Sequence, residues 1–150
     1  MMVNRYRGGS STVSSKHEKA ILRGTLTDYA LAFHNLDRQR VLPYYHEPLM
    51  LIGRAGVRVL ATRAEIEAWM SSFWTQLKER LFARATKFSP LRVRRVSANA
   101  AFASVRFVRY DVRGQELERI GATYVLHKTD TGWKIVAIVT HDPSEVLRLE

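Results

Sequence analysis

The chain lacks cysteine altogether, which excludes a disulfide framework, a thiolate nucleophile and a zinc site built on thiolates. It also lacks any apolar run close to the roughly 18 residues that a membrane span requires, and its N-terminus lacks the apolar segment of a signal peptide. The glycines of Arg7-Gly8-Gly9 precede no predicted strand-to-helix turn, so a phosphate-binding loop is not expected. We therefore expect a soluble, cytoplasmic protein that does not contact a membrane.

Metal ligands in a recognisable spacing are lacking as well. The five histidines show no ligand spacing with carboxylates; they are His17, His34, His46, His127 and His141. The sequence therefore predicts neither a metal centre nor another cofactor.

Acidic residues are scarce relative to basic ones. The chain has 14 Asp and Glu against 24 Lys and Arg, a formal charge of +10, and such an excess can attract phosphate backbones. The densest basic cluster is Arg92, Arg94 and Arg95, but neighbours on a strand point to opposite faces, so the three do not form one patch. We therefore favour a basic, solvated surface over a nucleic-acid partner.

Length and composition indicate one domain. With 150 residues, 46% of them hydrophobic, the chain can bury a substantial core but is short for two domains. The segment Met1–Ser15 is rich in Gly, Ser and Thr, and we expect a disordered tail there. Residues 16–150 then form the single domain.

Three helices are predicted in the first part of the chain. In Lys16–Asn35 the apolar residues recur at spacings of one, three and four, which is typical of an amphipathic helix. A shorter helical stretch covers Leu36–Tyr45. The strongest pattern is Thr62–Phe82, where Thr62 and Glu65 form a capping box ahead of a long apolar stripe.

Two-residue alternation predicts the strands. A short hairpin is expected from Leu49–Ile52 and Val57–Leu60, and a further strand from Phe88–Val96. Ala101–Asp142 follows as three long strands joined by two short turns, and such links favour antiparallel neighbours. Helices and strands segregated in this way predict an α+β domain with helices on one face of an antiparallel sheet.

Several segments carry a resemblance to a known superfamily. They are Tyr44–Gly53 (YYHEPLMLIG), the helix start Thr62-x-x-Glu65, Arg109-Tyr110 with Gly114, Tyr124, and Gly132–Ile135 leading into His141-Asp142. In these segments, and in the order of elements over roughly residues 17 to 142, the chain resembles the NTF2-like superfamily, close to its SnoaL-like and uncharacterised branches. The resemblance implies a cone: a curved antiparallel sheet with three N-terminal helices packed on its concave face, closing a cavity. It also implies a homodimer, because many relatives dimerise through the outer face of the sheet.

Candidate catalytic residues lie at the predicted rim of that cavity. Tyr45 and His46 stand where the second helix passes into the first strand, and either side chain can donate or accept a proton. His141 ends the last strand and suits acid/base work near pH 7, with a purely structural role at the strand end as the alternative. The adjacent Asp142 points to the opposite face of a regular strand, so the two do not form a dyad.

Candidate binding residues lie on the long strands and the long helix. If Arg109 points inward, its planar guanidinium fits an anionic or carbonyl group, whereas a cross-strand ion pair is the alternative. Tyr110 and Tyr124 are further candidates for substrate binding. Trp69 and Phe73 line the helix side of the cavity if it is open, or form ordinary helix-on-sheet core.

Two functions are compatible with this pattern. The first is a domain that binds a small, largely apolar molecule in a pocket, with any chemistry of the acid/base kind, such as isomerisation, dehydration or cyclisation. The second is a non-catalytic, dimeric interaction or accessory module whose pocket is filled by its own side chains. The second function predicts no cavity of about 300 Å³ or more.

Overall fold

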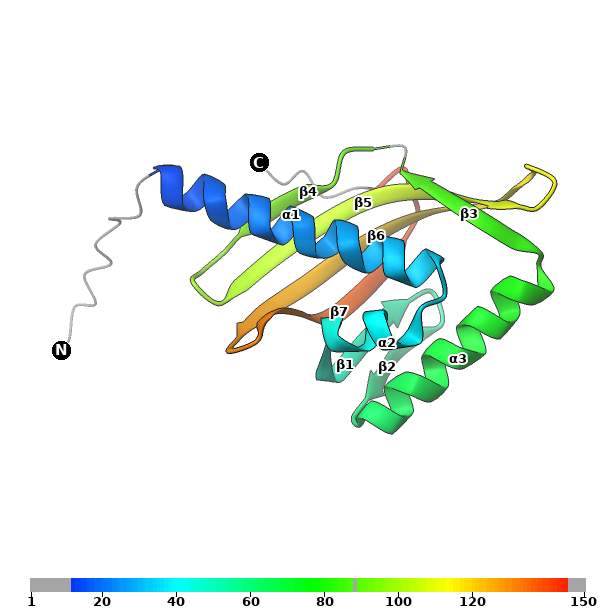
Figure 1. Cartoon of the computed structure of the whole chain (residues 1–150), viewed down its shortest axis with the longest axis horizontal. Coiled ribbons are helices and arrows are strands. Elements are labelled where there is room, and N and C mark those ends of the chain that lie inside the picture. The colour runs from blue at the N-terminus through cyan, green and yellow to red at the C-terminus, as the bar shows by residue number, and fades with distance from the viewer. Residues whose placement is uncertain (1–11, 88, 146–150) are drawn as a thin grey trace.

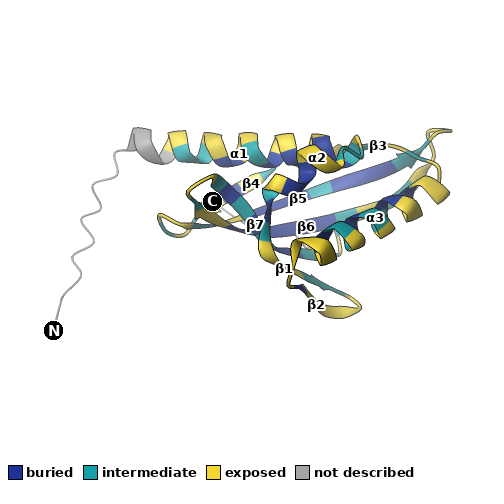
Figure 2. Cartoon of the chain, turned by 60° about the horizontal axis from the view of Figure 1, so that its bottom comes forward, coloured by how far each residue is buried: buried dark blue, intermediate teal, exposed yellow. Residues whose placement is uncertain are grey.

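Helix α1 (Thr12–His34) lies lengthwise over the concave side of a curved sheet, and α3 (Arg63–Glu79) lies at one end of the same side (Figure 1). The structure is a computed structural model that describes residues 12–87 and 89–145. The remaining elements are α2 (Arg38–Val41), a 3-10 turn (Leu42–Tyr44), β1 (Tyr45–Gly53), β2 (Gly56–Leu60), β3 (Phe82–Lys87), β4 (Arg92–Arg95), β5 (Ala100–Asp111), β6 (Glu116–Thr129) and β7 (Gly132–His141). The buried residues of α1 and α3 face the sheet, and their exposed residues face outward (Figure 2).

The sheet is mixed and open. Its strand order is β2-β1-β7-β6-β5-β3, and β4 pairs with β5 next to β3. Strand β1 pairs in parallel with β7, while the other neighbours are antiparallel. The prediction of a wholly antiparallel sheet is therefore wrong at this one pairing. Short links between consecutive strands set the antiparallel pairs, but β1 and β7 are far apart in the sequence and no link length constrains them.

The start of α3 forms as predicted. Thr62 is the N-cap, its hydroxyl accepts a hydrogen bond from the Glu65 backbone N–H, and the Glu65 carboxylate accepts one from the Thr62 backbone N–H. The helix ends at Glu79, three residues before the predicted end at Phe82. Leu81 there has a positive φ of 58°, which ends the right-handed helix and turns the chain into β3.

Several predicted boundaries differ from the structure. The strand predicted over Leu49–Ile52 is longer and covers Tyr45–Gly53, so Tyr45, predicted to end the second helix, begins β1. Strand β3 begins at Phe82, the last residue of the predicted helix, and continues to Lys87. The alternation pattern did not predict a strand in this segment. The strand predicted over Phe88–Val96 is shorter, Arg92–Arg95. Thr12–Ser15, predicted to be part of a disordered tail, belongs to α1. The rest of that predicted tail, residues 1–11, lies outside the described residues.

The pleat of β5 separates two faces, as the alternation predicted. The odd-numbered residues from Ala101 to Arg109 face the helices, and the even-numbered residues from Phe102 to Tyr110 form part of the outer face. Ala101 and Ala103 are fully buried in one core cluster with Leu22 of α1. In the described part of the chain, no helix is long and apolar enough to cross a membrane.

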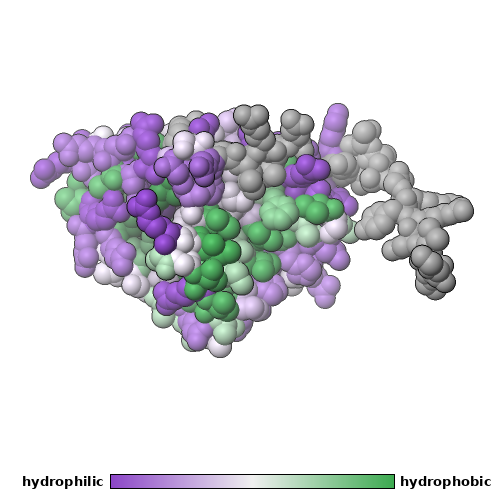
Figure 3. Space-filling model, turned by 180° about the vertical axis from the view of Figure 1, so that it is seen from behind, coloured by the Kyte–Doolittle hydropathy of each residue, from purple (hydrophilic) through white to green (hydrophobic). Residues whose placement is uncertain are grey.

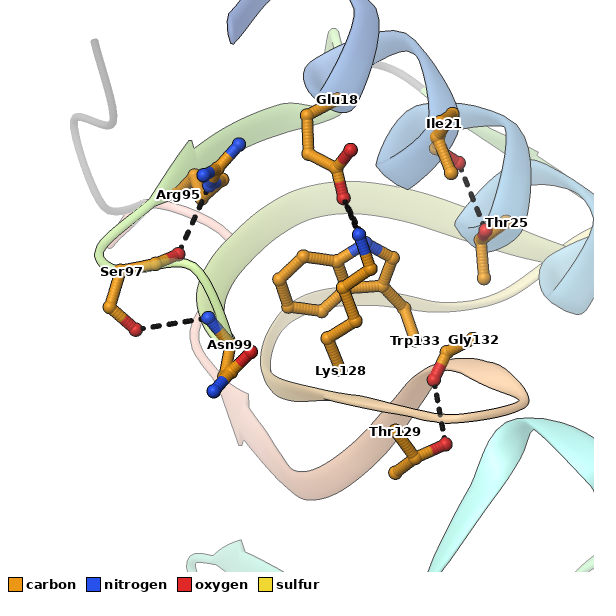
Figure 4. A network of polar contacts seen from close by, with 10 residues as sticks. All are labelled: Glu18, Ile21, Thr25, Arg95, Ser97, Asn99, Lys128, Thr129, Gly132 and Trp133. Carbon is orange, nitrogen blue, oxygen red and sulfur yellow. Dashed lines mark hydrogen bonds and ion pairs between the residues drawn. The ribbon is translucent and has the colours of Figure 1, made fainter. Parts of the chain in front are cut away.

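One polar contact fixes the N-terminal half of α1 over the sheet. Glu18 reaches from α1 to the turn between β6 and β7 (Figure 4). Its Oε1 accepts hydrogen bonds from Lys128 Nζ at 2.8 Å and from Trp133 Nε1 at 3.0 Å. The hydrogen bond from Lys128 is the main reason why the pKa of Glu18 lies below its usual range. Because Trp133 is buried, Glu18 is the partner that satisfies an otherwise costly indole N–H.

We expect Glu18→Ala to lower the free energy of unfolding by about 1 to 3 kcal/mol, because it leaves the buried indole N–H of Trp133 without an acceptor. Glu18→Gln is the matched control: it keeps an acceptor oxygen but loses the charge, so its loss is smaller. Urea unfolding followed by tryptophan fluorescence measures both. The lowered pKa means that the charge stabilises the fold above the ordinary carboxyl pKa, and that this contribution is lost as the pH falls through the folded value. An alanine variant as stable as the wild type would contradict this role.

Candidate functional site

The inner row of β5 changes from small to large side chains along the strand. After Ala101 and Ala103, the same row continues with Val105, Phe107 and Arg109. A cavity of about 910 Å³ lies between these three side chains and helices α1 and α3. Its walls come from α1, α3, β3, β5, β6 and β7, and include Tyr29, Phe33, His34, Trp69, Phe73, Arg80, Arg109, Glu118, Ile120, Tyr124 and Ile138.

Aromatic rings form the helix side of the cavity. Phe33 of α1 contacts Phe73 of α3 with ring centroids 5.7 Å apart. Trp69 stacks on Phe73 at 6.3 Å and meets Tyr45 edge-on at 5.8 Å. These contacts join α1, α3 and β1 into one apolar wall, as expected where a ligand with a large apolar surface binds.

Arg109 points into the cavity from β5 and is only 5% exposed. Its Nη1 donates a hydrogen bond to Glu118 Oε1 at 2.6 Å, across the strand pair of β5 and β6. Its guanidinium carbon lies 5.1 Å from the ring centroid of Phe73 and 4.9 Å from that of Phe107. The Nε atom is buried and has no hydrogen-bond partner among residues 12–87 and 89–145.

Three tyrosines meet beside Arg109. The hydroxyls of Tyr29 and Tyr45 share a hydrogen bond of 2.8 Å, and Tyr124 meets Tyr29 edge-on at 6.0 Å. Burial raises the pKa of each hydroxyl, that of Tyr124 to about 12, while the charge of Arg109 acts against burial at Tyr29 and Tyr124. All three are therefore protonated at neutral pH and can serve as hydrogen-bond donors.

His34, in the last turn of α1, is another polar residue that lines the cavity. Burial is the main cause that lowers its pKa to about 4, the positive charge of Arg109 adds to it, and a hydrogen bond to the backbone of Ala30 opposes it. The imidazole is therefore neutral at pH 7. Its Nε2 is buried without a hydrogen-bond partner in the part of the chain that the structure describes. A neutral nitrogen in this position can accept a hydrogen bond or a proton.

The structure does not bring the three predicted catalytic residues together. Tyr45 is buried behind Tyr29. His46 lies outside the cavity, where its Nδ1 bonds to the carbonyl of Pro48 and its ring meets that of His127 at 6.1 Å. No observation tests their roles in catalysis, which stay predictions.

His141 is on the cavity's perimeter at the end of β7, but its ring packs on the outer face of the sheet against Gly121. Both ring nitrogens are satisfied, Nε2 by the hydroxyl of Thr123 at 2.8 Å and Nδ1 by the carbonyl of Asp142 at 2.9 Å. A side chain added at Gly121 would come within 2.4 Å of this ring, so glycine is the residue that fits.

Among the predicted binding residues, Trp69, Phe73, Arg109 and Tyr124 line the cavity. Tyr110 does not: it is on the outer face, where Arg84 lies 4.3 Å above its ring. Whether any of them binds a substrate stays a prediction.

His34 and Glu118 are cavity residues that the sequence interpretation missed. The helical spacing could have indicated that His34 faces the sheet. It lies four positions after Ala30 and one after Phe33, at the margin of the apolar stripe of α1. Glu118 carried none, since its partner Arg109 is matched to it only by the register of β5 with β6.

Comparison with known proteins agrees with this architecture. Residues 18–143 match the family described as NTF2-like protein (DUF6841). No curated protein sequence matches the chain. Among solved structures, an NTF2-like protein of unknown function from Shewanella oneidensis MR-1 has a TM-score of 0.67 and 17% identity, covering 83% of this chain and 99% of that chain.

Two further solved structures have names that mention an activity. A ketosteroid isomerase-like protein from Erwinia carotovora atroseptica SCRI1043 has a TM-score of 0.62 and 18% identity, over 82% of this chain and 94% of its own. A candidate dehydratase of the NTF2-like family from Streptomyces avermitilis has a TM-score of 0.65 and 14% identity, over 84% of this chain and 96% of its own. At such identities the likeness concerns the fold alone, and it confirms the predicted α+β cone. Since the family match spans most of the domain, the chain belongs to the NTF2-like family DUF6841.

Proposed function

We propose that the chain binds a small, largely apolar molecule in the cavity, and that any chemistry there is of the isomerase, dehydratase or cyclase type. The observation that carries the proposal is the cavity of about 910 Å³, walled by aromatic rings and entered by a few buried polar groups. Ligand pockets in proteins commonly have volumes of about 300 to 1,000 Å³ and this composition. The names of the isomerase-like and dehydratase relatives are compatible with acid/base chemistry.

The alternative is a non-catalytic interaction or accessory module with a filled pocket. That alternative predicts a cavity below about 300 Å³, because the protein's own side chains would occupy the space. The cavity volume of about 910 Å³ favours an open pocket.

The polar groups of the cavity suit a substrate with a carbonyl or anionic oxygen. Arg109 and Tyr124 can donate hydrogen bonds to that oxygen, and Nε2 of His34 can accept a proton from a neighbouring atom. Tyr45 contributes through its hydrogen bond to Tyr29. The other two predicted catalytic residues are His46 and His141. Their side chains lie on the outer face of the sheet, so a catalytic role for them would require a ligand on that face.

We expect Ala122→Phe to abolish ligand binding, because Ala122 lines the cavity from β6 and a phenyl ring there would occupy it. A panel of cyclic ketones is screened by thermal shift, and any ligand that raises the melting temperature of the wild type should bind the variant at least about tenfold more weakly. Val112→Phe is the control, since Val112 is 65% exposed and does not line the cavity, so a ring added there should leave binding unchanged. Equal binding by both variants would place the ligand elsewhere.

We expect His34→Phe to make the stability of the protein less dependent on pH. The unfolded chain takes up a proton at His34 below about pH 6.5, whereas the folded protein does so only near its lowered pKa of about 4. The wild type therefore loses stability as the pH falls through this window. Between pH 7 and pH 5 it should lose on the order of 1 to 2 kcal/mol more than the variant, measured by urea unfolding. Equal losses would mean that His34 is not neutral in the folded protein.

We also propose that the chain is a homodimer through the outer face of its sheet. Apolar residues stand side by side across five strands there, in the row Val59, Met50, Ala137, Val125 and Phe102. Several are exposed, Val59 by 54% and Met50 and Phe102 by 37% each. Figure 3 shows hydrophobic side chains gathered on this side of the molecule. An exposed apolar patch of this kind supports a protein partner.

We expect Met50→Glu and Phe102→Glu to convert the dimer to a monomer, because each places a charge in the apolar row. Val112→Glu is the control: Val112 is 65% exposed but follows the end of β5, outside the row. Sedimentation velocity measures the three variants and the wild type. A monomeric wild type would contradict the proposal.

A further inference from the structure

Arg109 carries a buried positive charge whose hydrogen-bonding capacity is only partly used. The rings of Phe73 and Phe107 occupy the space around its guanidinium, so polar partners can approach its edges rather than its faces. Glu118 takes the edge at Nη1, while Nε on another edge is buried and has no hydrogen-bond partner among the described residues. A guanidinium presents Nε and Nη2 as a parallel pair of donors, which matches the two oxygens of a carboxylate.

The charge of Arg109 is not fully compensated by its neighbour. Glu118 Oε1 also accepts from Arg80 Nη1 at 3.2 Å, so one carboxylate serves two guanidinium groups. The cluster of Arg80, Arg109 and Glu118 therefore has a net charge of +1. The Arg80 side chain is 43% exposed, so water solvates its charge, whereas the unused donor of Arg109 is buried and is costly unless an acceptor, such as an oxyanion in the cavity, completes its hydrogen bonds.

The cavity walls carry more positive than negative charge in general. Arg54 and Lys87 line it as well, and its lining carboxylates are Glu118 and Asp142. The Asp142 carboxylate accepts hydrogen bonds of 2.8 and 2.6 Å from the backbone and hydroxyl of a serine two residues further on. An apolar cavity with this excess of cations attracts anions and raises their local concentration.

We infer that the ligand is an apolar monocarboxylic acid, bound as its anion, whose carboxylate accepts hydrogen bonds from Nε and Nη2 of Arg109. Its apolar body then lies against Phe33, Trp69 and Phe73. This inference rests on the proposed function and narrows its class of ligand. A carboxylate fits better than a phosphate monoester, because a dianion with three oxygens needs more donors than one guanidinium edge presents.

The test compares matched acids and amides on the full chain by isothermal titration calorimetry. The probes are aromatic, alicyclic and linear pairs: 2-naphthylacetate and its amide, cyclohexylbutyrate and its amide, and octanoate and its amide. Each pair has nearly the same shape and differs in charge. We expect the acid of the best-binding pair to bind at least about tenfold more tightly than its amide. An alkyl phosphate is included and should bind more weakly than the acid of the same chain length.

Three variants locate the preference for the acid over the amide. Arg109→Met keeps an apolar side chain of similar length and leaves Glu118 paired with Arg80, so the acid should fall to the affinity of the amide while the amide is unaffected. Arg80→Met is the matched control, because Arg80 shares Glu118 and lines the cavity but is exposed. It should change the ratio of acid to amide affinity by less than about twofold. Arg109→Lys keeps the charge without the paired donors and should retain part of the preference.

The possible failures are distinguishable. If amides bind as tightly as acids in the wild type, the carboxylate assignment is wrong while the proposed pocket stands. If Arg80→Met removes the preference for the acid over the amide, the anion binds at Arg80 and not at Arg109. The assignment is then again wrong. If none of the acids or amides binds and the cyclic ketones fail as well, the proposed function itself is wrong. The comparison of acid with amide needs only the wild type, so it holds even if Arg109→Met does not fold.

Discussion

A single helix laid over a curved sheet cannot contact it equally along its whole length, and the rest of the structure depends on this constraint. At one end, α1 comes close to β4, and Leu22 is fully buried in one cluster with Val93 of β4 and the alanines on the inner row of β5. At the other end, Phe107 and Arg109 stand up from the same row and α1 is supported by the rings of α3. Close packing in the first region fixes the helix, and the large side chains in the second region keep the cavity open.

The same row explains why a charge can lie inside an apolar cavity. Arg109 is placed there by the pleat of β5, and the register with β6 brings Glu118 opposite to it. The aromatic rings around the guanidinium exclude water, which strengthens the ion pair and makes any unused donor costly. The field of Arg109 then reaches the other cavity groups: it helps to lower the pKa of His34 and opposes the effect of burial on the pKa of Tyr124. The charge of Arg109 therefore modifies the effect of burial, which is the main cause of both shifts.

Patterns within one element could be predicted from the sequence, and contacts between distant elements could not. The capping box of Thr62 and Glu65 and the alternation along β5 involve neighbouring residues, and both are present. The parallel pairing of β1 with β7 depends on tertiary packing, so the turn lengths gave no sign of it. Strand β3 was missed because it lies at an edge and is largely exposed, and edge strands need no apolar alternation. The inward direction of Arg109 was left open, because alternation defines two faces without saying which one the helices cover.

Two histidines show why site residues are harder to predict than elements. From the sequence, His141 was a catalytic candidate because a histidine suits acid/base work near pH 7, whereas His34 lies near the end of an amphipathic helix and was not singled out. In the structure His141 has a hydrogen-bond partner on each ring nitrogen, which is what a residue that stabilises a sheet requires. His34 has a buried nitrogen that finds no hydrogen-bond partner among the described residues, and the same holds for Nε of the nearby Arg109. Folded proteins rarely leave two such groups together in one cavity unless something else completes their hydrogen bonds. Within the described residues both ring nitrogens of His141 are hydrogen-bonded and Nε2 of His34 is not, and this difference is visible only once the tertiary contacts are known.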